Sequence, residues 1–161
     1  MVMVPVRISL INRLWRLWVI HLLFAILSIP VSALTQFLQS KYSSELAGTV
    51  ALMLGFILFA AYFIVLTRVA TRILFTFRDG LITGILAALP FLLLIAAALL
   101  YLSRVPYNTI GYNLIMLPVM FPFSAWIEQI YPALPFHVLN LSVPLVVFAA
   151  TCTGSLLRKN N

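Results

Sequence analysis

The chain has 161 residues, of which 64% are hydrophobic and only 8% are charged. A soluble domain carries about a quarter of charged residues to keep its surface wet, so this composition and the mean hydropathy of +1.15 exclude a water-facing shell and favour lipid as the solvent. The net charge of +7 is that of many nucleic-acid-binding proteins. Here, however, the basic residues stand at the ends of apolar runs, where Lys and Arg meet lipid headgroups. We expect the bilayer as their partner and no nucleic acid.

Four uncharged apolar segments are predicted to cross the membrane. Each reaches roughly the 20 residues that a helix needs to span the hydrocarbon layer, and each must be helical because the backbone groups can find no partner in lipid. The segments are residues 17–37, 46–67, 81–103 and 138–157. The sequence therefore predicts an all-α integral membrane protein, with residues 1–161 forming a single membrane domain built as a four-transmembrane-helix bundle.

The start of the chain permits a second interpretation. A basic region through Arg16 precedes an apolar stretch that ends at Pro30-Val31-Ser32-Ala33, where the small residues resemble a signal-peptidase site. Cleavage after Ala33 would leave three spans. The apolar stretch is longer than most signal cores, so an uncleaved first span that begins in the headgroup layer is favoured.

The charges predict the orientation of the bundle. With the N-terminus inside, eight basic residues face the cytoplasm and two, Lys41 and Arg104, face outward, as the positive-inside rule requires. The eight are Arg7, Arg13, Arg16, Arg68, Arg72, Arg78, Arg158 and Lys159. We expect a multi-pass protein of the cytoplasmic membrane with both termini in the cytoplasm.

The cytoplasmic side is also where anionic lipid is expected. Arginines interleaved with aromatic residues suit negatively charged headgroups, and Trp126 is a candidate for the opposite interface. The predicted headgroup contacts are Arg13, Arg16, Arg68, Arg72, Arg78 and Trp126.

The third span opens with a row of small residues. Gly80, Gly84 and Ala88 recur every four residues and so lie on one helix face, where small side chains let another helix approach closely. Asp79 stands just before them, as a predicted N-cap. The partner is either another helix of this chain, which we favour, or a second copy.

Residues 104–136 are predicted to form an external segment. A fifth span at 105–127 would place Arg158 and Lys159 outside and reduce the charge bias to six against four, and Pro106, Pro118 and Pro122 interrupt a continuous helix. Within the segment, Phe121 to Tyr131 has the apolar rhythm of a short amphipathic helix. We expect that helix to lie on the outer membrane surface between the third and fourth spans.

Few residues could bind a metal ion or take part in catalysis. Glu45, Glu128 and His137 fall near the outer surface and form a possible polar site, although their spacing matches no metal-ligand pattern. His21, in the first span, belongs to the opposite leaflet, and an intramembrane ionisable residue is a candidate for function. Cys152 stands alone in an apolar stretch and supports neither a disulfide nor a metal cluster. No catalytic residue, metal or cofactor is predicted.

Three functions follow from this pattern. The spans contain no carboxylate, no G-x-S-x-G and no H-E-x-x-H, which favours a non-enzymatic accessory or regulatory subunit that binds a membrane-protein partner or a second copy. The first alternative is a small-solute or ion transporter or channel, for which only His21 is a suitable mid-membrane group. The second is an outer-face lipid enzyme that uses Glu128 and His137.

Overall fold

The computed structural model describes residues 9–42, 44–104 and 141–159, and these are almost entirely helical. Four helices are present in these ranges: α1 (Leu10–Lys41), α2 (Ser44–Ile73), α3 (Phe77–Arg104) and α7 (Ser142–Lys159). The described part of the chain contains no strand. The predicted external segment and its amphipathic helix lie outside the described residues.

Three of the helices, α1, α2 and α3, are long and apolar enough to cross a membrane. The 32 residues of α1 extend about 48 Å at 1.5 Å per residue, which exceeds a hydrocarbon core of about 30 Å. The helices therefore continue past the uncharged segments on which the predicted spans were based. In the described residues α7 is shorter, with 18 residues, and residues 138–140 of the predicted fourth span lie outside them.

The helix starts are set by short polar side chains. Ser9 caps α1, its hydroxyl accepting a hydrogen bond from the backbone N–H of Asn12 at 3.4 Å. At the start of α3 the hydroxyl of Thr76 accepts from the N–H of Asp79 at 3.1 Å. The prediction that Asp79 caps α3 is therefore wrong: Thr76 is the cap, and Asp79 lies in the first turn.

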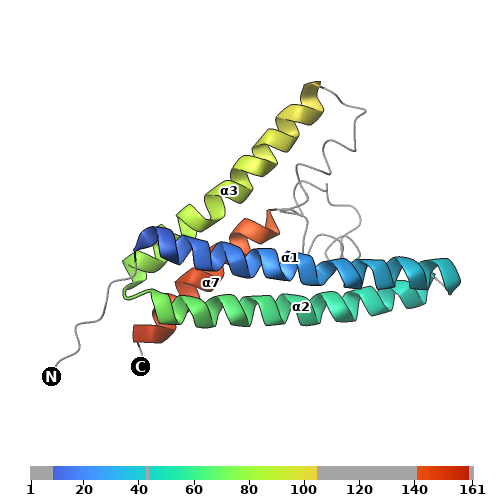
Figure 1. Cartoon of the computed structure of the whole chain (residues 1–161), viewed down its shortest axis with the longest axis horizontal. Helices are drawn as coiled ribbons and strands as arrows, with labels where there is room; N and C mark the ends of the chain where they lie inside the picture. The colour runs from blue at the N-terminus through green and yellow to red at the C-terminus, as the bar shows by residue number, and fades with distance from the viewer. Residues whose placement is uncertain (1–8, 43, 105–140, 160–161) are drawn as a thin grey trace.

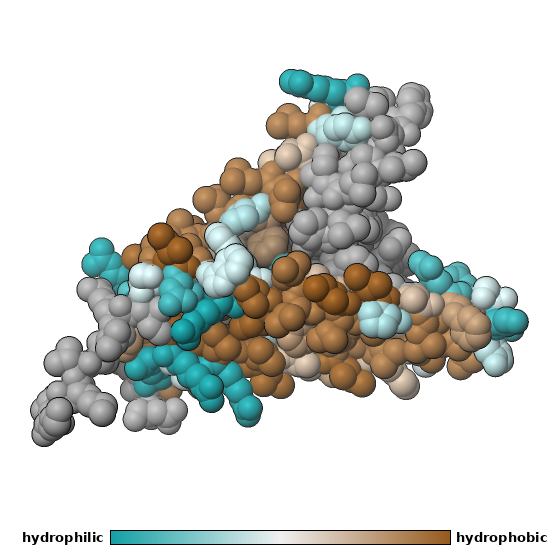
Figure 2. Space-filling view, viewed as in Figure 1, coloured by the Kyte–Doolittle hydropathy of each residue, from teal (hydrophilic) through white to brown (hydrophobic). Residues whose placement is uncertain are grey.

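The helices α1 and α2 form an antiparallel pair, while α3 diverges from this pair and α7 packs against α2 and α3 (Figure 1). The start of α1, the turn from α2 to α3 and the end of α7 all lie at one end of the molecule (Figure 1). We call this the basic end, because the arginines at positions 13, 16, 68, 72, 78 and 158 belong to it. Figure 2 shows hydrophilic residues gathered there and a broad hydrophobic surface along the helices.

The inner face of α1 follows a heptad-like rhythm. Its buried residues are spaced four and three apart, at Leu17, His21, Phe24 and Ser28, which is the pattern of helices that pack with a shallow left-handed crossing. Near the basic end the core is completed by residues from every helix, including Tyr62, Leu66, Ile73, Leu74, Ala87, Phe91, Val143 and Val147. At the far end α1 and α2 run on side by side (Figure 1), and we call residues 31–41 and 44–55 there the two-helix arm.

Candidate functional site: the basic end and the His21 pocket

A buried ion pair joins α1 to α3. Nη1 of Arg13 lies 3.4 Å from Oδ1 of Asp79, and their side chains are only 6% and 19% exposed. Asp79 is in the first turn of α3, where the unpaired N–H groups and the helix dipole favour a carboxylate. The pair connects residues that are far apart in the sequence and holds the first turns of both helices together.

A second arginine, Arg158 of α7, binds the end of α2. Its Nη1 donates to the backbone carbonyls of Thr71, Arg72 and Leu74 at 3.3, 3.1 and 3.0 Å. The last carbonyls of a helix have no partner within that helix, and a cation there also complements the helix dipole. Arg158 therefore caps α2 from a different helix.

Phe75 lies between the two arginines. The guanidinium carbon of Arg158 is 4.3 Å from the centre of the Phe75 ring, and that of Arg13 is 5.8 Å from it. Both distances allow a cation–π interaction. At the basic end, Phe75 thus contacts both arginines, and Asp79 also binds Arg13.

The glycines of α3 lie against α7. A Cβ added to Gly80 or Gly84 would collide with the hydroxyls of Ser155 and Thr151 respectively. Ala88, which completes the predicted face, is 6% exposed. The helix that faces Gly80 and Gly84 is thus α7 of the same chain.

Gly154 occupies the opposite side of α7, against α2. A Cβ there would meet the backbone carbonyl of Thr67 at 2.7 Å and the backbone N of Thr71 at 2.9 Å. Because these are backbone atoms, no side chain can move aside to make room. Gly154 therefore sets the distance between α2 and α7, although no sequence signal singled it out.

A polar pair is buried between α1 and α2. Nδ1 of His21 and the hydroxyl of Tyr62 form a 2.8 Å hydrogen bond whose direction depends on the imidazole tautomer. His21 is 5% exposed and Tyr62 is fully buried, and Phe91 of α3 packs on the imidazole with its ring centre 4.5 Å away. His21 thus contributes to contacts among three helices.

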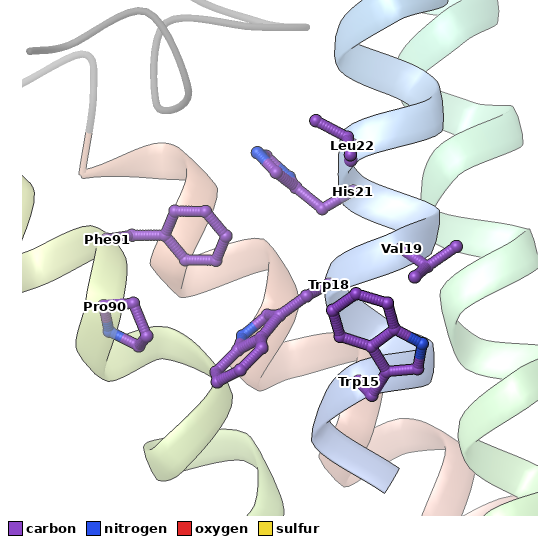
Figure 3. Close-up of a pocket in the computed structure, with 7 residues that line it drawn as sticks. All are labelled: Trp15, Trp18, Val19, His21, Leu22, Pro90 and Phe91. Carbon is purple, nitrogen blue, oxygen red and sulfur yellow. The ribbon is translucent and has the colours of Figure 1, made fainter. Parts of the chain in front are cut away.

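Beside His21 is an apolar pocket of about 280 Å³. His21 and Trp18 extend from α1 toward Phe91 and Pro90 of α3 (Figure 3). We call it the His21 pocket, and its lining is Trp15, Trp18, Val19, His21, Leu22, Pro90 and Phe91.

Trp18 also binds the helix turn that precedes a proline. Pro90 has no N–H and disturbs the hydrogen bonding of the turn before it. In that turn the carbonyl of Ala87 accepts a 3.2 Å hydrogen bond from Nε1 of Trp18. The pocket is therefore built around a proline whose preceding turn is bound by an indole of the neighbouring helix.

The predicted headgroup residues differ in their exposure to the surface. Arg16, Arg68, Arg72 and Arg78 are exposed at the basic end, whereas Arg13 is buried and bound to Asp79. Trp126 lies outside the described residues.

The predicted outer-face site is only partly visible. Glu45 lies in the first turn of α2, at the end of the molecule opposite the basic end (Figure 1). Glu128 and His137 are outside the described residues, so the structure brings no members of this group together. Within the described ranges no three His, Cys, Asp or Glu residues are close enough to hold a metal ion.

The sequence contained a second small-residue row that the prediction overlooked. Ala47, Ala51 and Gly55 recur every four residues and are all buried in α2, on a helix that runs beside α1 (Figure 1). This is the same spacing as that of Gly80, Gly84 and Ala88 in α3.

Comparisons with protein-family models, with curated proteins and with solved structures find no match to this chain.

Proposed function

We propose that the chain is a non-enzymatic accessory or regulatory subunit of a membrane complex. The observation that carries the proposal is that three polar side chains bind groups on other helices. Arg13 binds Asp79, Arg158 binds carbonyls of α2, and His21 binds Tyr62. In each case the polar group joins one helix of the chain to another, so its chemistry serves to hold the bundle in one arrangement.

The outward faces offer apolar contact surface. Large hydrophobic side chains more than half exposed occur on all three long helices, and such a surface suits lipid or the apolar face of another membrane protein. Examples are Leu22, Ile26 and Leu27 on α1, Met53, Phe56 and Ile57 on α2, and Leu93 and Leu100 on α3.

The membrane placement is part of the proposal. A bundle with four spans would have the basic end on the cytoplasmic side of the cell membrane, in accordance with the positive-inside rule. Lys41 and Arg104 end α1 and α3 on the outside. A cysteine introduced at Ser9 should react with a membrane-impermeant maleimide only after the cells are opened, and one at Ser40 should react in intact cells.

Site-specific photocrosslinking in the native host tests the accessory role. A photoreactive residue is placed at Leu27, Ile57 or Leu93, one on each exposed face. A subunit that binds a partner should give one discrete protein adduct from one face and lipid adducts from the others, and deleting the gene should lower the amount of that partner. If no face crosslinks to protein and mild detergent releases only monomer, the accessory role is wrong.

The His21 pocket supports a second candidate, a small-solute or ion transporter. His21 is an ionisable residue inside an apolar helix and lines a pocket, and such residues commonly mark transport pathways. Liposomes that contain the pure protein should then show solute or proton flux, and His21→Phe should abolish it. Equal flux in wild-type and His21→Phe liposomes would exclude this pocket as the pathway.

A further inference from the structure

A second groove lies on the other side of α1, between α1 and α2 at the basic end. Its volume is about 330 Å³. We call it the Arg16–Arg72 groove, and its lining is Trp15, Arg16, Val19, Ile20, Val69, Arg72 and Ile73.

The charges at this groove have no carboxylate beside them. The chain has three acidic residues: Asp79 is bound to Arg13, Glu45 lies at the opposite end of α2, and Glu128 is outside the described residues. Among the described residues, the one salt bridge does not involve Arg16 or Arg72. Two arginines therefore line one groove with no described anion to balance their charges.

The groove also has a direction. The antiparallel arrangement of α1 and α2 means that Val19 and Ile20 follow Arg16 away from the basic end, and Val69 precedes Arg72 in the same direction. Toward the middle of the helices, the lining beyond the two arginines is therefore apolar. Nε of Arg16 donates to Oδ1 of Asn12 at 3.4 Å, which orients its guanidinium.

We propose that this groove is a specific site for one anionic phospholipid, whose phosphate binds Arg16 and Arg72 and whose acyl chain lies along Val19, Ile20 and Val69. Arginine binds phosphate through paired N–H donors, and the apolar floor matches the chain attached to that phosphate. The inference rests on the proposed membrane placement, and it narrows the general affinity of a basic surface for anionic lipid to two of its arginines.

Native mass spectrometry of the full chain in detergent tests the proposal. The protein is titrated with phosphatidylglycerol and with phosphatidylcholine of the same acyl chains, and the first bound lipid is counted. One phosphatidylglycerol should bind at clearly lower concentration than phosphatidylcholine. Arg16→Gln/Arg72→Gln should weaken its binding about 25-fold, since each arginine near a headgroup contributes roughly a fivefold effect.

The matched control is Arg68→Gln/Arg78→Gln, which removes the same two charges from the same end of the molecule. It should change phosphatidylglycerol binding less than about twofold, because neither arginine lines the groove. An equal loss in both double variants would show that the attraction is diffuse and that no specific site exists. Equal binding of the two lipids to the wild type would also overturn the proposal.

Two further experiments distinguish lipid from free phosphate and test the groove without removing its charges. Glycerol phosphate at the same concentration should not displace the lipid; if it does, the site binds phosphate without the chain and the proposal is wrong. Val69→Phe keeps both charges but fills the groove, and it should weaken phosphatidylglycerol binding as strongly as the arginine pair does. These readouts do not involve a protein partner, so they stay informative whether or not the accessory role holds.

Discussion

The basic end and the two-helix arm of α1 and α2 are held together by different means. At the basic end, elements from all four described helices meet, and charged side chains bind between them: Arg13 binds Asp79, and Arg158 binds the end of α2. In the arm, α2 instead buries the small residues Ala47, Ala51 and Gly55, and the hydroxyl of Thr35 on α1 donates to the carbonyl of Val31 of its own helix. The difference teaches that directional polar contacts specify the junction, whereas the arm has small buried residues and no salt bridge among its described residues.

The largest effect is expected from Asp79→Ala. The substitution leaves the buried Arg13 without its carboxylate, and breaking a buried pair from one side costs about 3 kcal/mol or more. Unfolding in mixed detergent and SDS micelles, followed by circular dichroism, measures the loss. Arg13→Leu/Asp79→Leu should recover most of it because no unpaired charge remains, and Glu45→Ala in the arm should have a minor effect. A double variant as unstable as the single one would show that the ion pair is not the cause.

The second-largest effect is expected from Gly154→Val, which should lower the free energy of unfolding by about 2 kcal/mol. The added carbons meet backbone atoms of α2 that cannot move aside. The same unfolding measurement applies. Ala149→Val enlarges an exposed residue of the same helix and should leave stability nearly unchanged. Similar losses from both substitutions would mean that valine weakens α7 itself rather than its contact with α2.

Tyr62→Phe should lower the free energy of unfolding by about 1 kcal/mol, the usual contribution of one buried hydrogen bond between helices. The substitution keeps the ring and removes only the hydroxyl that binds His21. His21→Phe in the Tyr62→Phe background should add less than it does alone, since the two side chains share the bond. Strictly additive losses would indicate that the pair is not coupled.

Ala51→Leu should have the smallest effect on global stability, below about 1 kcal/mol, because the arm can open locally without unfolding the basic end. Hydrogen exchange should quicken over residues 31–41 and 44–55 and stay unchanged at Arg13 and Asp79. Met53→Leu on the exposed side of α2 serves as the control. Faster exchange at both ends would show that the two regions unfold as one unit.

The predicted spans 17–37, 46–67 and 81–103 lie within α1, α2 and α3, because the absence of charge over roughly 20 residues follows directly from the cost of burying charge in lipid. The helices extend beyond these ranges at both ends. Arg13, Arg68 and Arg72 are helical, since a helix that leaves the hydrocarbon layer can continue with charged residues. Hydropathy identifies the membrane-crossing part of a helix and not its ends.

The candidate site was less accessible to sequence reasoning. Local spacing indicated a close contact at Gly80 and Gly84 but did not name α7 as the facing helix. The partners of Arg13 and Arg158 lie 66 and more than 80 residues away along the chain, and no local pattern relates such positions. The residues around Trp18 do not predict its hydrogen bond to the turn before Pro90. These pairings depend on tertiary packing, which a single sequence does not show.

The cap that Arg158 places on α2 has a consequence for biosynthesis. Arg158, which binds the carbonyls of Thr71, Arg72 and Leu74, is synthesised 84 to 87 residues after them. Arg13, in contrast, can bind Asp79 as soon as the start of α3 has been synthesised. The first three helices can therefore associate early, and the junction between α2 and α3 becomes fully bonded only when α7 arrives.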